Sequence, residues 1–110
     1  MGIRRFSGTV ESASPEFEGL RAPATLTLIN RGDWYECRFE FDVGVPVILT
    51  VVAEKDGGNE IRGTAKDPRG WDVVFAAKLA DGRVTGTFEQ PHDRGTFDLR
   101  ETDFSNSNRL

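Results

Sequence analysis

Few side chains in this sequence have the types and spacing that catalysis or metal binding requires. Glu36, Glu40 and Asp42 come closest, because the three acids share one short alternating segment. A glycosidase-like pair needs two carboxyl groups roughly 5–10 Å apart inside a cleft. In an alternating strand these acids point away from the apolar face, toward water. We therefore interpret them as a solvated face and predict no catalytic residue among them.

The single cysteine and the single histidine do not suggest a reactive centre. Cys37 lies on the apolar face of the same segment, where a buried and inert thiol is expected rather than a nucleophile. His92 lies in Pro91-His92-Asp93, which is typical of a turn. One histidine and one cysteine are too few for a zinc site. The sequence predicts no metal ion, no cofactor and no enzymatic activity.

Composition restricts the partners and the number of domains. The chain has 110 residues and a net charge of −4, and its longest apolar run is short. This length is typical of one domain, which we expect over residues 1–104, followed by a polar tail over 105–110. A negative domain is a poor binder of nucleic acid, and a short apolar run cannot cross a membrane as a helix. We predict neither partner.

The beginning of the chain and its cysteine content indicate a compartment. The first residues, Met1 to Phe6, enter an alternating pattern without the apolar stretch of a secretory signal. A single cysteine cannot form an internal disulfide, so nothing indicates an oxidising environment. We predict a cytoplasmic protein. Arginine outnumbers lysine, a hint of a GC-rich bacterial genome.

The elements that position all these residues are strands. Between Trp34 and Asp42, apolar and charged residues alternate with period two, which predicts a strand with one buried face. The strands expected from such alternation cover 4–11, 24–29, 34–42, 46–54, 60–66, 71–79, 83–89 and 94–101. Short turns separate them, and the Asp81-Gly82 turn is the strongest hairpin signal. Sequential hairpins predict an antiparallel up-and-down meander.

Eight strands with one apolar face must bury that face. An even number lets the last strand pair antiparallel with the first, so we predict an all-β, eight-stranded barrel, with a two-sheet β-sandwich as the alternative. The turn lengths predict that Trp71 faces Ala65 inside the barrel, and that Ile29 faces Trp34 outside it. We expect every inward position to be apolar or glycine, apart from the polar atoms of Tyr35, Trp71 and Cys37, and we expect no inward acid.

A Gly-Thr unit recurs along the chain, including Gly86-Thr87-Phe88 and Gly95-Thr96-Phe97. A wall of small residues could leave room for a ligand. The alternative, which we favour, is that Phe97 covers Gly86 and Phe88 covers Gly95 across a hairpin. The meander and these two motifs resemble small bacterial lipocalin-like barrels in plan. The Gly-x-Trp entry of lipocalins is absent, because Gly8-Thr9-Val10 stands there. The resemblance implies a fold and no function.

The longest connection follows the first strand. Residues 14–19 are typical of one helical turn, with Ser14 as N-cap, Pro15 at the first position and Gly19 at the end. Phe17 and Leu20 are three residues apart and could face the barrel mouth together. They could act as a structural plug that completes the core, which we favour, or as a lid over a cavity.

These patterns do not determine a function, and two hypotheses remain. The first is a non-catalytic interaction module that acts through its outer face, in an oligomer or with another protein. The second is a binding protein for a small apolar ligand inside the barrel. The interface residues of the first would be Ile29, Trp34, Ile48 and Val52, and the ligand residues of the second would be Phe17, Tyr35, Phe39, Trp71 and Phe75. We favour the first, since the inward side chains are sufficient to fill an eight-stranded barrel.

Overall fold

The protein forms a closed barrel of antiparallel strands. The computed structural model describes residues 2–12, 21–42, 46–55, 58–66, 70–91 and 93–102. Its strands are β1 (Ile3–Ser12), β2 (Arg21–Asn30), β3 (Trp34–Asp42), β4 (Pro46–Lys55), β5 (Glu60–Lys66), β6 (Asp72–Ala80), β7 (Arg83–Gln90) and β8 (Asp93–Glu101). Each strand pairs with the next along the chain, and β1 pairs with β8. The predicted all-β meander and its closure are confirmed, and the sandwich alternative is wrong.

Two further predictions concern segments outside this description. The helical turn over 14–19, with Phe17, and the polar tail over 105–110 lie outside the described residues. The barrel itself occupies the described part of the predicted domain from β1 to β8.

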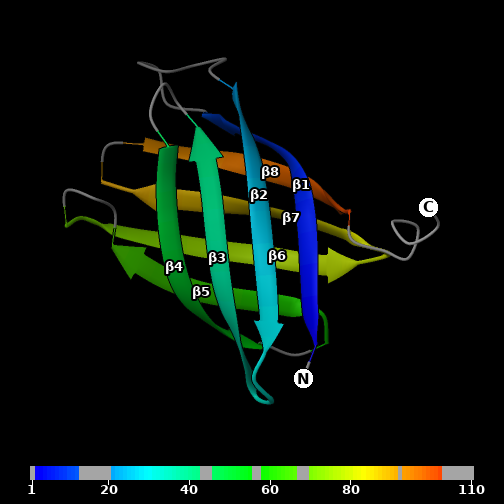
Figure 1. Ribbon diagram of the computed structural model, residues 1–110. Helices are drawn as coiled ribbons and strands as arrows, with labels where there is room; N and C mark the ends of the chain where they lie inside the picture. The colour runs from blue at the N-terminus through cyan, green and yellow to red at the C-terminus, as the bar shows by residue number, and fades with distance from the viewer. Residues whose placement is uncertain are drawn as a thin grey trace.

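The barrel is flattened into two layers that cross at a steep angle (Figure 1). Strands β1–β4 form one layer and β5–β8 run across behind it, which is the orthogonal arrangement of packed sheets. β3 and β4 pair along their whole lengths, from Trp34–Glu54 to Asp42–Pro46. β4 and β5 pair only from Val52–Thr64 to Lys55–Ile61. The first half of β4 therefore has no ladder partner among the described residues of β5.

The core consists of the inward residues that the alternation predicts. Its most deeply buried side chains, each less than 2% exposed, are Phe6, Leu28, Val73, Val84 and Leu99. Aromatic rings fill the centre, where the Phe39 ring lies 5.5 Å from that of Phe75 and 5.1 Å from that of Phe97, between centroids. The contact with Phe97 is edge-to-face, the arrangement that aromatic quadrupoles favour.

Two of the recurring glycines, Gly86 and Gly95, lie beneath aromatic rings. Gly86 pairs with Phe97 and Gly95 pairs with Phe88 across the β7–β8 hairpin. A Cβ atom on Gly86 would lie 2.7 Å from Cζ of Phe97, and one on Gly95 would lie 2.7 Å from Cε1 of Phe88. Real Cβ atoms do not approach so closely. The prediction that Phe97 covers Gly86 and Phe88 covers Gly95 is confirmed. These two glycines therefore leave no room for a ligand.

Two predicted registers were wrong by two residues. Ala65 pairs with Val73 rather than with Trp71, which precedes β6 and is half-buried. Ile29 pairs with Glu36 rather than with Trp34. A shift of two residues keeps every inward side chain inward, so alternation alone cannot detect it. The β2–β3 turn is tighter than predicted, because the amide of Arg31 donates to the carbonyl oxygen of Trp34 at 2.9 Å.

Charged side chains cover one end of the barrel. Arg4 and Glu101 occupy inward positions of β1 and β8, and they form two hydrogen bonds, of 2.9 Å from Nε and 2.7 Å from Nη2. The guanidinium carbon of Arg4 lies 5.3 Å from the centroid of the Phe6 ring. Nearby, Nζ of Lys55 lies 4.6 Å from the centroid of the Tyr35 ring. Long cationic side chains thus cover aromatic rings at this end of the core.

Candidate functional site

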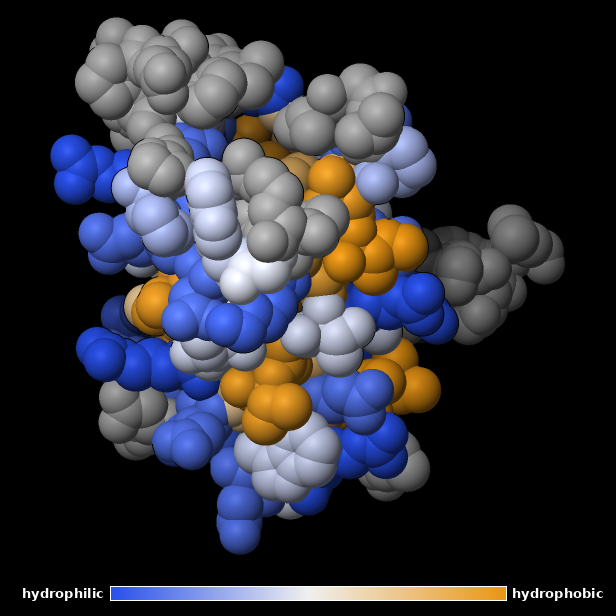
Figure 2. Space-filling model, turned by 90° about the vertical axis from the view of Figure 1, so that its left-hand side faces the viewer, coloured by the Kyte–Doolittle hydropathy of each residue, from blue (hydrophilic) through white to orange (hydrophobic). Residues whose placement is uncertain are grey.

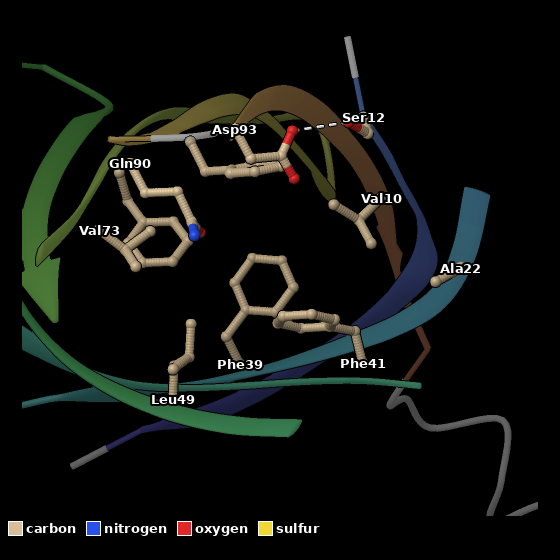
Figure 3. Close-up of a pocket in the computed structure, with 11 residues that line it drawn as sticks. Val10, Ser12, Ala22, Phe39, Phe41, Leu49, Val73, Gln90 and Asp93 are labelled. Carbon is tan, nitrogen blue, oxygen red and sulfur yellow. Dashed lines mark hydrogen bonds between the residues drawn. The ribbon is translucent and has the colours of Figure 1, made fainter. Parts of the chain in front are cut away.

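The opposite end of the barrel contains a pocket (Figure 3). It lies where β1 ends and β8 begins, and its cavity volume is about 90 Å³. The residues that line it are Val10, Ser12, Ala22, Phe39, Phe41, Leu49, Val73, Phe75, Phe88, Gln90 and Asp93. Leu49 belongs to the first half of β4. The pocket therefore adjoins the half of β4 that is not paired with the described residues of β5.

Strand alternation directs three polar side chains into this pocket. Ser12 follows Val10 on the inward face of β1, and Gln90 follows Phe88 on β7. Asp93 pairs with Gln90 across the β7–β8 turn and lies two residues before the inward Gly95. Because inward positions recur every second residue, these side chains lie at the mouth, above the apolar core.

The Asp93 carboxylate is held by two donors on one of its oxygens. The hydroxyl of Ser12 donates to Oδ1 at 2.7 Å, and the backbone amide of Arg94 donates to the same oxygen at 2.8 Å. No residue in the described ranges donates a hydrogen bond to Oδ2. In Figure 3 this second oxygen points into the pocket, and the Gln90 amide extends into it from the neighbouring strand.

Aromatic rings form the facing wall. Phe39, Phe41, Phe75 and Phe88 all line the pocket, and the rings of Phe39 and Phe41 meet edge-to-face with centroids 5.8 Å apart. Phe39 is 3% exposed, so the floor of the pocket is part of the core. The site is amphipathic, with phenyl rings on one side and a carboxylate on the other.

The predicted ligand residues are distributed over the whole barrel. Phe39 and Phe75 line the pocket, whereas Tyr35 lies at the opposite end beneath Lys55. Trp71 precedes β6 and is not among the described lining residues. Phe17 lies outside the described residues.

The expectation of no inward acid was wrong, because Asp93 and Glu101 both lie on the inward face of β8. The register of this hairpin was right, but the predicted strands stopped at 89 and began again at 94, one residue pair short of Gln90–Asp93. If the alternation is continued from Gly95 back to Asp93, and from Val10 on to Ser12, it predicts that both polar side chains point inward at the mouth of the barrel.

The predicted interface residues do not form one continuous apolar surface. Glu36 lies between Ile29 and Val52 in the ladders, and Trp34 pairs with Glu54. Ile48, which is 49% exposed, lies four residues from Val52 on the same strand. Figure 2 shows hydrophobic side chains in separate spots among hydrophilic ones on the face that it presents. The interface hypothesis stays a prediction.

Among the described residues, neither Cys37 nor a cluster of metal-binding side chains forms a second site. Burial, together with the charge of Glu36, raises the pKa of the Cys37 thiol to about 12. At neutral pH the group is therefore a thiol and not a nucleophilic thiolate. In the part of the chain that the structure describes, no three His, Cys, Asp or Glu side chains are grouped as a metal site would require. Nor does that part contain a helix long and apolar enough to cross a membrane.

Comparisons with known proteins support the architecture. No family model matches the sequence, and no curated protein matches it. Among solved structures, the chain is similar to a designed protein described as "De novo design of a fluorescence-activating beta barrel". The two share 18% sequence identity with a TM-score of 0.66, and the alignment covers 92% of each chain. A likeness at this identity shows the barrel fold.

Proposed function

We propose that this protein binds a small, largely apolar molecule at the mouth of the barrel and does not transform it. The observation that carries the proposal is the composition of the pocket, in which an aromatic wall faces the polar groups of Ser12, Gln90 and Asp93. Pockets that bind small molecules are typically apolar concavities with a few placed polar groups that fix the orientation of the ligand.

The size of the cavity limits the ligand. A closed apolar cavity of roughly 150 Å³ takes up benzene. At about 90 Å³ this cavity is smaller, so a single ring fits if part of it extends through the mouth. We therefore propose a ligand with one ring or a short branched alkyl group rather than a long chain.

The lining favours binding over catalysis. Asp93 is the one acidic, basic, histidine, cysteine or tyrosine side chain among the lining residues that the structure describes. Glycosidase-type catalysis uses two carboxyl groups in different protonation states, and the described lining contains one. The hydroxyl of Ser12 donates to Asp93, and no histidine is among the described lining residues, whereas a serine nucleophile is typically activated by an adjacent imidazole.

We favour ligand binding over the interaction module, because the pocket is one continuous surface and the apolar outer face is not. The pocket residues share one concave surface, whereas Glu36 interrupts the apolar residues of the outer face. An apolar surface that charged side chains divide offers less area to exclude water at an interface.

Filling the pocket tests the proposal. Ala22 lines the cavity and is 4% exposed, so Ala22→Leu adds three carbons where a ligand would lie. We expect toluene or indole to shift the amide resonances of pocket residues in the wild type, and to shift them at least about tenfold less in the variant. Ala76→Leu is the matched control, because Ala76 lies on the outer face of β6. If no small aromatic compound shifts the pocket resonances of the wild type, the proposal is wrong.

A further inference from the structure

We infer that the pocket selects small organic cations, specifically a primary ammonium group attached to a ring or short alkyl group. This inference rests on the proposed function and names its ligand class. The ammonium would donate to Oδ2 of Asp93, and the hydrocarbon part would lie against the phenylalanine wall.

The first argument is the orientation of the carboxylate. Ser12 and the Arg94 amide both donate to Oδ1, so the plane of the carboxylate is fixed before any ligand enters. Oδ2 points into the cavity and receives no donor from the described residues. A partly enclosed carboxylate oxygen is stabilised by a charged N–H donor more strongly than by a neutral one.

The second argument is the charge around the pocket. No lysine or arginine is among its described lining residues. Asp93 takes part in none of the described ion pairs, unlike Glu101 at the other end, which is paired with Arg4. The whole chain carries a net charge of −4. A cation entering the mouth therefore meets a carboxylate that forms no ion pair with the described residues, whereas an anion would be repelled.

The third argument is the aromatic wall. A cation within about 6 Å of a phenyl ring is attracted to its face, more so where water is excluded. The barrel already uses this contact at its opposite end, where Arg4 lies over Phe6 and Lys55 over Tyr35. At the mouth, four phenylalanine rings surround the cavity without a protein cation among the lining residues described. We infer that the ligand supplies the cation there.

Three probes of nearly equal shape test the inference: benzylamine, benzyl alcohol and toluene. We expect wild-type protein to bind benzylamine at least about tenfold more tightly than either neutral probe, by calorimetry or NMR titration at neutral pH. Asp93→Asn keeps the shape of the side chain and removes its charge, so it should reduce this preference to within about threefold. Asp98→Asn is the control, since it removes an equal charge from the outer face of β8 and should leave the preference unchanged.

The outcomes separate the inference from the proposed function. If toluene and benzyl alcohol bind in the pocket as tightly as benzylamine, the inference is wrong and the proposed function stands. If none of the three probes binds, both fail. The wild-type comparison decides the matter even if Asp93→Asn does not fold.

Discussion

Arg4 and Glu101 are 97 residues apart in the sequence, and their side chains join the first strand of the barrel to the last through two hydrogen bonds. The Glu101 side chain is 25% exposed and the Arg4 side chain 42%. The hydrogen bond and the charge of Arg4 hold the pKa of Glu101 below its ordinary value of 4.5, against the opposing effect of burial. The pair therefore couples the stability of the closed barrel to pH.

Removal of the Glu101 charge should destabilise the barrel near neutral pH and not in acid. Because the pKa of Glu101 is lower in the folded state, its stabilisation is complete above the ordinary value of 4.5 and is lost as the pH falls through the folded value. We expect Glu101→Gln to lower the free energy of unfolding by about 1 kcal/mol at pH 7, within the range for a largely solvent-accessible pair. Urea unfolding at pH 7 and at about pH 3 should show the difference shrinking in acid.

A more exposed pair provides the control for this experiment. Lys66 and Asp72 form an ion pair whose side chains are 68% and 63% exposed. Asp72→Asn should change the urea midpoint less than Glu101→Gln does, because exposed pairs contribute little. Equal stability of wild type and Glu101→Gln at pH 7 would contradict a stabilising role for the Arg4–Glu101 pair.

A methyl group on Gly86 should destabilise the barrel. Its Cβ would overlap the carbonyl oxygen of Ala76 and lie 2.7 Å from Cζ of Phe97. Overpacking of this kind costs about 2 kcal/mol, which exceeds the gain from a stiffer unfolded chain. Gly86→Ala should lower the urea midpoint without changing its slope. Gly2→Ala, where no atom lies within 4 Å of the new Cβ, should have no effect. An unchanged midpoint for Gly86→Ala would contradict the close packing.

The Cys37 thiol should react only when the barrel opens. Cys37 is 4% exposed, and burial, with a contribution from Glu36, raises its pKa to about 12. We expect its reaction with a disulfide reagent at pH 8 to be at least about a hundredfold slower in native protein than in guanidinium chloride. Val52→Cys in a Cys37→Ala background is the control, since Val52 is 59% exposed. A fast native reaction of Cys37 would show that β3 opens readily.

The interface hypothesis makes its own prediction for Trp34. If the outer face joins two or more chains, native mass spectrometry should show a multiple of the chain mass. Trp34→Glu should then shift it to the mass of the monomer, because the new charge would be buried in the contact between the chains. Thr85→Glu adds the same charge on the exposed outer face of β7 and should not change the mass. An assembly that survives Trp34→Glu would count against this interface.

The sequence was most informative where alternation and turn residues agreed. All eight strands were predicted close to their observed bounds, and the pairing of Phe88 with Gly95 was correct. Alternation has a period of two, so it fixes which face a residue occupies but not its partner across a turn. The prediction that Trp71 faces Ala65 was therefore wrong, and Val73, two residues later, occupies that position.

The candidate site was harder to predict, because it lies where strands end. Ser12 and Gln90 are the last inward positions of β1 and β7, and Asp93 is the first of β8. Strand boundaries are the part of a strand that a sequence pattern predicts least well. The contact between Ser12 and Asp93 also depends on the pairing of β1 with β8. That pairing can be expected from an even number of strands, but its register cannot, because no turn joins the two.

The pairing of β1 with β8 also determines when the barrel can be completed. In a chain emerging from the ribosome, β1 cannot pair completely with β8 until Glu101 has been synthesised. Until then, one edge of β1 remains at least partly unpaired. Contacts of such long sequence separation carry a large entropic cost and form slowly. During that interval the β8 strand of a second chain could occupy the same edge with the same ladder. Exchange of this strand between two chains is therefore the misfolding route that the topology of this barrel most directly permits.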